Sequence, residues 1–145
     1  MSSTETAPTQ RIVVGVDGSQ SSIAALGWAG HQAEVTGSSL EVIMTWEWPT
    51  NFGWSLPFPA DYNPSFDAQK LLDTTMAELH TAAAVSSQLV QGHPAVVLTE
   101  ASLGADLLVV GSRGHGEFSG MLIGSVSEHC ATHAHCPVLV FRERT

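Results

Sequence analysis

Short apolar runs alternate with stretches of helical periodicity along most of this chain of 145 residues. Residues 12–16 and 138–141 are apolar at consecutive positions, which is typical of strands that are buried on both faces of a parallel sheet. The segment from Gln20 to Thr36 instead carries apolar residues at helical spacing. Such alternation, with right-handed crossovers, predicts an α/β fold: an open five-stranded parallel sheet with helices on both faces.

The pattern gives approximate bounds for each element. Strands are expected at 12–16, 40–46, 85–90, 106–110 and 138–141, and helices at 20–36, 65–84, 95–102 and from about 125 to 135. In the second helix, the row expected to be buried is Phe66, Leu71 or Leu72, Met76, Leu79 and Ala83. Gly37 is expected to end the first helix. Residues 1–10 are predicted to form a flexible tail, and residues 11–145 a single domain.

Glycines are concentrated between the fourth strand and the last helix. Gly111 and Gly114 allow positive φ angles and a close approach of backbone to a ligand. The helix that follows points the N–H groups of its first turn and the positive end of its dipole at this loop. Ser125 and Ser127 add hydroxyl donors. Together these features favour a phosphate site.

The spacing Gly111-x2-Gly114-x9-Gly124-Ser125 resembles the nucleotide-binding signature of the universal stress protein family, in the subgroup that binds ATP. The first strand and Asp17 resemble the start of the family's domain and its adenine-contacting aspartate, and the likeness covers about residues 11–142. It implies a Rossmann-like sheet with strand order 3-2-1-4-5. Ligands of such sheets bind where the winding reverses, outside the first and fourth strands. The two motifs are therefore expected to face one crevice.

The resemblance also implies which residues hold a nucleotide. From base to ribose to phosphates, they are Gly15, Val16, Asp17 and Thr45, then Val110 and Gly111, then Arg113, Gly114, His115, Gly124, Ser125, Val126 and Ser127. The expected ligand is ATP, alone or with Mg²⁺. Two structural alternatives remain open: Asp17 could simply close an Asx turn, and the glycines could form a turn that binds nothing.

A net charge of −9 disfavours nucleic acid and anionic membranes as partners. Arg113 is the one basic residue in the glycine loop. Backbone amides, hydroxyls and a divalent cation would therefore carry most of the phosphate charge. No apolar run approaches the roughly eighteen residues of a membrane span, and the N-terminus does not resemble a signal peptide. A cytoplasmic location without membrane contact is expected.

Histidines and cysteines lie close together near the C-terminus. His129 and His133 are one helical turn apart, a spacing found in metal sites. Cys130, however, falls on the apolar row of its helix, as a small core residue would. Cys136 directly precedes Pro137 at the entry to the last strand. We expect a buried thiol and a solvated histidine face here, and no metal site.

No motif for fast catalysis is present. The glycine loop has no Walker lysine and the chain has no nucleophile elbow, so no catalytic residue is expected, and slow ATP hydrolysis at most. The resulting interpretation is an ATP-binding regulator of stress responses. The resemblance implies a homodimer that pairs through strand 138–141, an edge that needs cover. The alternatives are a dimeric scaffold that recruits a protein partner through its aromatic loop, residues 46–62, and a slow ATPase.

Overall fold

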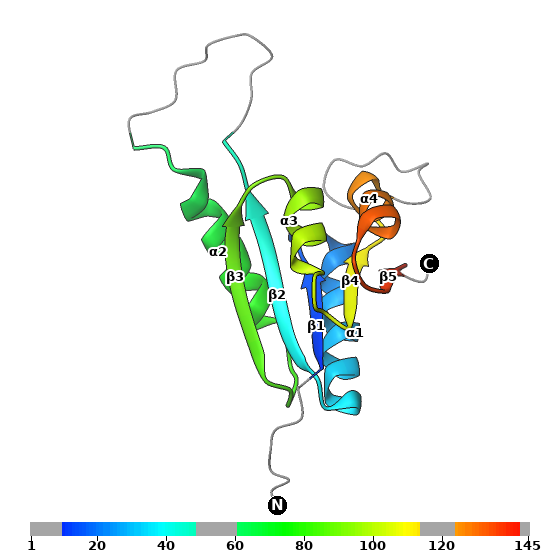
Figure 1. Ribbon diagram of the computed structural model, residues 1–145. Coiled ribbons are helices and arrows are strands. Elements are labelled where there is room, and N and C mark those ends of the chain that lie inside the picture. Colours follow the sequence, from blue (N-terminus) through cyan, green and yellow to red (C-terminus); the bar gives the residue numbers. More distant parts are fainter. Residues whose placement is uncertain (1–9, 49–60, 114–123, 143–145) are drawn as a thin grey trace, which may run out of the picture.

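The computed structural model describes residues 10–48, 61–113 and 124–142 (Figure 1). Its strands are β1 Arg11–Gly15, β2 Ser39–Trp46, β3 Val85–Gln91, β4 Leu107–Gly111 and β5 Val138–Phe141. Its helices are α1 Gln20–Thr36, α2 Pro64–Ala77, α3 Pro94–Ala101 and α4 Ser125–His133. All strands are parallel, in the order β3-β2-β1-β4-β5. The predicted fold class and strand order are confirmed.

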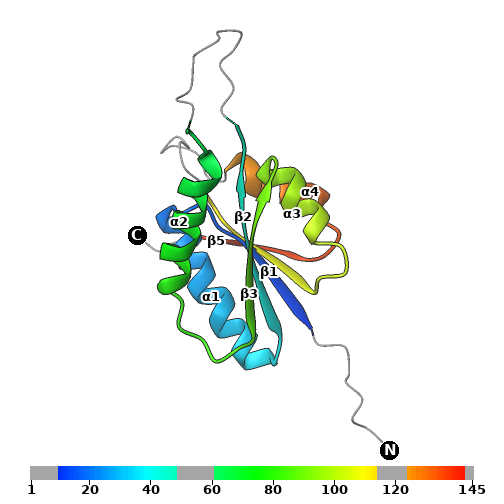
Figure 2. The same ribbon diagram turned by 90° about the vertical axis from the view of Figure 1, so that its left-hand side faces the viewer.

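The sheet separates two layers of helices. Helices α1 and α2 cover one face, and α3 and α4 cover the other (Figure 2). Val14 belongs to the apolar cluster that includes Leu26 of α1, whereas Val13 belongs to the cluster that includes Cys130 of α4. Neighbouring residues of β1 are thus buried on opposite faces, which explains why its sequence is continuously apolar.

Most predicted bounds are right to within one or two residues, but α2 is an exception. The helix ends at Ala77 rather than near residue 84. The segment that follows is held by bonds to α1 instead: the Thr81 hydroxyl donates to the Gly30 carbonyl at 2.9 Å, and the Ala82 amide donates to the Glu34 carboxylate at 3.0 Å. These contacts replace the backbone bonds that another helical turn would have made.

The buried row predicted for α2 is also partly wrong. Leu72 and Thr75 are the buried residues of this helix, and Phe66 is 68% exposed. Leu79 and Ala83 do pack against the core, but from the segment beyond the helix. Their spacing in the sequence therefore showed correctly that they are buried, but it did not show a helix.

Side chains cap three of the helices that the structure describes. Ser19 accepts from the Ser22 amide at 3.2 Å at the start of α1, and Asn63 caps α2 in the same way. At α3, Nδ1 of His93 accepts from the Ala95 amide at 3.1 Å. Helix α4 begins at Gly124 without a side-chain cap. Gly37 ends α1 in the left-handed conformation, with φ of 71°, as predicted.

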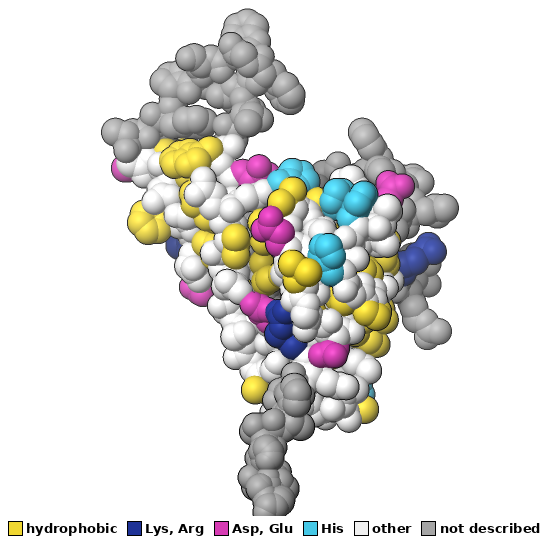
Figure 3. Space-filling view, in the orientation of Figure 1, with side chains coloured by type: hydrophobic (Ala, Val, Ile, Leu, Met, Phe, Trp, Pro, Cys, Tyr) yellow, Lys and Arg dark blue, Asp and Glu magenta, His cyan; other side chains and the backbone are white. Residues whose placement is uncertain are grey.

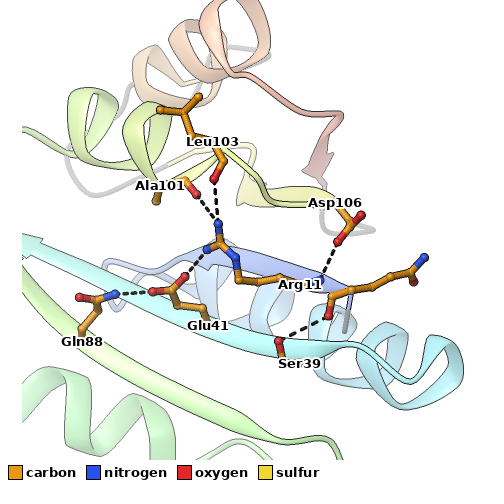
Figure 4. A network of polar contacts seen from close by, with 8 residues as sticks. Arg11, Ser39, Glu41, Gln88, Ala101, Leu103 and Asp106 are labelled. Atoms are coloured by element: carbon orange, nitrogen blue, oxygen red, sulfur yellow. Dashed lines mark hydrogen bonds and ion pairs between the residues drawn. The ribbon is translucent and has the colours of Figure 1, made fainter. Parts of the chain in front are cut away.

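Arg11 joins several elements at the amino-terminal end of the sheet (Figure 4). Its guanidinium pairs with Glu41 at 2.5 Å and donates to the carbonyl oxygens of Ala101 and Leu103 at 3.3 and 2.9 Å. Its own amide donates to the Asp106 carboxylate at 2.7 Å. This end of the sheet is therefore closed by polar contacts, opposite the end where ligands of such folds bind.

None of the helices in the described segments has the length and apolar character to cross a membrane.

The His93 cap gives a prediction for stability. Replacing His93 with Ala removes the acceptor for the Ala95 amide, so we expect the free energy of unfolding to fall by about 1 kcal/mol. Replacing it with Asn keeps an acceptor at the N-cap and should preserve stability. Urea unfolding of both variants beside the unmodified protein tests this. Equal stability of the Ala and Asn variants would show that the cap contributes nothing.

Candidate functional site

A cleft opens where β1 and β4 end side by side. It contains about 550 Å³ of empty space, counted out into the solvent at its open mouth. Its walls come from the ends of β1, β2 and β4 and from the first turns of α1, α3 and α4. The predicted site residues among its lining are Gly15, Val16, Asp17, Thr45, Val110, Gly111, Arg113, Gly124, Val126 and Ser127.

Among the described residues, one predicted site residue is not part of this lining. Ser125 is exposed on the first turn of α4 and does not line the cleft. Gly114 and His115 lie outside the described residues, as does most of the aromatic loop.

One wall of the cleft is apolar, and sequence reasoning missed most of it. Ile43 of β2 and Pro94 and Leu98 of α3 line this side, and Ser22 of α1 lines the cleft as well. A signal for Ile43 existed, because it lies two positions before Thr45 and so shares its side of the strand. Leu98 had none, since the packing of α3 against the sheet brings it to the cleft.

Gly15 leaves room for this apolar wall. A Cβ atom on Gly15 would lie 2.5 Å from Cδ1 of Leu98, closer than atoms in contact allow. A larger residue at position 15 would push Leu98 and the wall of the cleft away from the sheet.

Asp17 both closes a turn and lines the cleft. Its Oδ1 accepts from the Ser19 amide at 2.9 Å, which is the Asx turn considered from the sequence. Its own amide donates to the Ser22 hydroxyl at 3.2 Å. A carboxylate has more acceptor positions than this one bond uses. The turn also fixes the direction in which the carboxylate points.

Gly111 is required for close packing rather than for backbone conformation. The sequence suggested positive φ for the loop glycines, but Gly111 is not among the glycines with positive φ in the described residues. A Cβ atom there would lie 2.6 Å from Oγ and 2.9 Å from the carbonyl carbon of Ser21. The end of β4 therefore lies directly against the first turn of α1. The Arg113 amide also approaches Ser21, with its nitrogen 3.5 Å from the hydroxyl oxygen.

The two ends of the glycine loop meet at Ser112. Its carbonyl oxygen accepts from the Gly124 amide at 2.5 Å and from the Ser127 hydroxyl at 3.3 Å. Ser127 is 2% exposed and also donates to the Gly124 carbonyl at 3.1 Å. These bonds bring the start of α4 to the mouth of the cleft.

The electrostatics of the cleft favour an anion at this end. The first turn of α4 supplies backbone amides and the positive end of a helix dipole, and its N-cap residue, Gly124, has no side chain to cap them. Among the described residues of the lining, Arg113 is the one with a cationic side chain. Ile43, Pro94 and Leu98 give the same cleft an apolar wall, so it suits a ligand with an apolar part and a phosphate.

The histidines and cysteines do not form a metal cluster in the described residues, where no group of three or more potential ligands is close enough. Histidine side chains gather over α3 and α4 (Figure 3). The rings of His129 and His133 stack with centroids 4.3 Å apart. Cys130 is buried, as predicted, and burial raises the pKa of its thiol and of the Cys136 thiol.

Comparisons with known proteins agree with this architecture. The model of the universal stress protein family matches residues 8–142. The universal stress protein Rv2623 of Mycobacterium tuberculosis is 36% identical over 141 residues, which cover 91% of this chain and 45% of that protein. The chain spans about half the length of the curated relatives it matches.

Solved structures share the fold. A universal stress protein in complex with cAMP is 31% identical, with a TM-score of 0.62 and coverage of 91% of this chain and 95% of that one. The hypothetical protein MJ0577 has a TM-score of 0.73 at 17% identity, with 94% and 97% covered. The chain belongs to the universal stress protein family.

Proposed function

We propose that this domain binds ATP in the cleft and that the bound nucleotide regulates a stress response. The observation that carries the proposal is that an apolar wall and the first turn of α4, whose N-cap is a glycine, line one cleft. A further support is the 31% identical relative, which was solved in complex with cAMP, an adenine nucleotide.

The lining suggests how each part of the nucleotide is held. The base fits between Val16 and the wall formed by Ile43 and Leu98, where burial of apolar surface stabilises it. Asp17 can accept a hydrogen bond from the adenine amino group, and Thr45 also lines the cleft. The phosphates then lie at the first turn of α4.

The charge of the protein bears on the form of the ligand. The net charge is −9, and Arg113 is the one basic residue among the described residues of the lining. A triphosphate at this site needs further neutralisation, which Mg²⁺ would supply when bound to it. The chain's own share is made up of backbone amides and the dipole of α4.

Binding fits this cleft better than rapid turnover. Asp17 is the one carboxylate among the described residues of the lining, and it lies where the base is proposed to bind rather than beside the phosphates. It is therefore poorly placed to activate a water molecule for attack on a phosphate. A protein that holds ATP in this way is suited to signalling, because the ligand stabilises whichever conformation binds it better.

We also propose that the domain is a homodimer paired through β5. This strand lies at one edge of the sheet, and all its residues, Val138–Phe141, are only partly buried. An apolar edge strand with this exposure favours pairing with a second strand, which would cover it.

One observation favours the scaffold alternative. The rings of Trp46 and Trp48 lie edge to face with centroids 6.0 Å apart, and those of Trp48 and Tyr62 lie 6.1 Å apart. Trp48 is still 47% exposed. Aromatic side chains of this kind are enriched at protein interfaces. This cluster is the surface to test for a protein partner if no nucleotide binds.

Calorimetric titration tests the nucleotide proposal. We expect ATP to bind with micromolar affinity, about −8 kcal/mol, and more tightly with Mg²⁺. Arg113→Gln should weaken ATP binding about tenfold, which is about 1.4 kcal/mol, and leave the affinity for adenosine unchanged. The matched control is Arg142→Gln, which removes an equal charge from an exposed position after β5. No heat with any adenine nucleotide would refute the proposal, and equal losses in the two variants would mean that only the overall charge matters.

Sedimentation equilibrium tests the dimer. Each chain has a mass of 15.3 kDa, so a dimer has twice that mass. We expect Val140→Lys in β5 to dissociate the dimer, because it places a charge at the paired edge. Val85→Lys, in the strand at the opposite edge of the sheet, should leave the dimer intact. A monomeric unmodified protein, or dissociation by Val85→Lys alone, would contradict pairing through β5.

A further inference from the structure

Three serines lie where the glycine loop, residues 111–124, begins and ends. Strand β4 ends at Gly111, one residue before Ser112, and Gly124 is the N-cap of α4. Ser112 is 7% exposed, and its carbonyl oxygen accepts from both the Gly124 amide and the Ser127 hydroxyl. On the other side, Ser21 of α1 lies against Gly111 and close to the Arg113 amide. We call Ser21, Ser112 and Ser127 the serine clasp.

The Ser127 hydroxyl is already committed within this clasp. A hydroxyl group has one proton to donate. In Ser127 this proton is shared between the carbonyl oxygens of Ser112 and Gly124, at 3.3 and 3.1 Å. What remains on the oxygen is acceptor capacity, and a phosphate oxygen requires a donor. Ser127 therefore faces the cleft without a proton available for an anion.

Redirecting this hydroxyl toward a ligand would have a cost. Ser127 is 2% exposed, so water does not replace the hydrogen bonds that it would give up. The Gly124 carbonyl also accepts from the Glu128 amide at 2.9 Å, as the first backbone bond of α4. One of the two bonds of the hydroxyl is thus to Gly124, the N-cap residue at which α4 starts.

We infer that Ser127 is a positioning residue that fixes the start of α4 relative to β4, and that it is not a phosphate ligand. This inference rests on the proposed nucleotide site. It changes the role that the family resemblance implies for Ser127, from direct contact to support of the backbone. The amides of the first turn of α4, rather than this hydroxyl, then bind the phosphate.

Hydrogen exchange of the Gly124 amide in the nucleotide-free protein separates the two roles. Ser127→Ala removes the hydroxyl bonds that hold Ser112 and Gly124 together, so we expect this amide to exchange about tenfold faster. ATP affinity should also fall several-fold. The matched control is Thr132→Ala, which removes another α4 hydroxyl that donates to a carbonyl, that of Glu128, at 3.0 Å. This control should leave the Gly124 amide unchanged.

Other outcomes overturn the inference. Unchanged exchange of the Gly124 amide together with weaker ATP binding would make Ser127 a direct ligand and leave the proposed function standing. If neither quantity changes, Ser127 has no role in the site. If the unmodified protein binds no nucleotide, the proposed function fails, and the exchange rate still shows whether the clasp exists. Should Ser127→Ala not fold, Ser127→Cys, with a weaker donor of similar volume, is measured by the same criteria.

Discussion

The structure depends on the parallel pairing of β1 with β4. In the register of these strands Ile12 lies opposite Leu107 and Val14 opposite Val109. Strands β2 and β3 extend the sheet on the far side of β1, and β5 extends it on the far side of β4. The connections that leave β1 and β4 therefore diverge, and a cleft opens between them. The proposed contacts of Val16, Asp17 and Gly111 with a ligand depend on this pairing.

Close packing at two glycines turns the gap between the connections into a specific cleft. Gly15 lets Leu98 approach the end of β1, and Gly111 lets the first turn of α1 approach the end of β4. Both positions lack space for a Cβ atom, so the distance between sheet and helices is fixed at the base of the cleft. In the serine clasp, hydrogen bonds link the residue after β4 to the start of α4. They therefore fix the proposed anion-binding end of the helix relative to the sheet.

Much of this arrangement could be predicted from the sequence, and the exceptions have physical reasons. Consecutive apolar residues identified β1 and β4, and the glycine spacing identified the start of α4. The end of α2 was not predictable, because Thr81 and Ala82 leave the helix for partners on α1, far away in sequence. Leu98 was missed for the same reason: its place in the cleft depends on how α3 packs. The spacing of apolar residues along the sequence shows which residues are buried. It does not show where a helix ends because its residues bond to another part of the chain.

The most direct test of the nucleotide site is a titration of ¹⁵N-labelled protein with ATP and Mg²⁺, followed by amide chemical shifts. We expect the largest changes at Val16, Gly111 and Val126, which line the cleft. The amides of Arg11 and Asp106, at the opposite end of the sheet, should not shift. Changes confined to Trp48 and its neighbours, or spread evenly over the surface, would contradict a nucleotide site between β1 and β4.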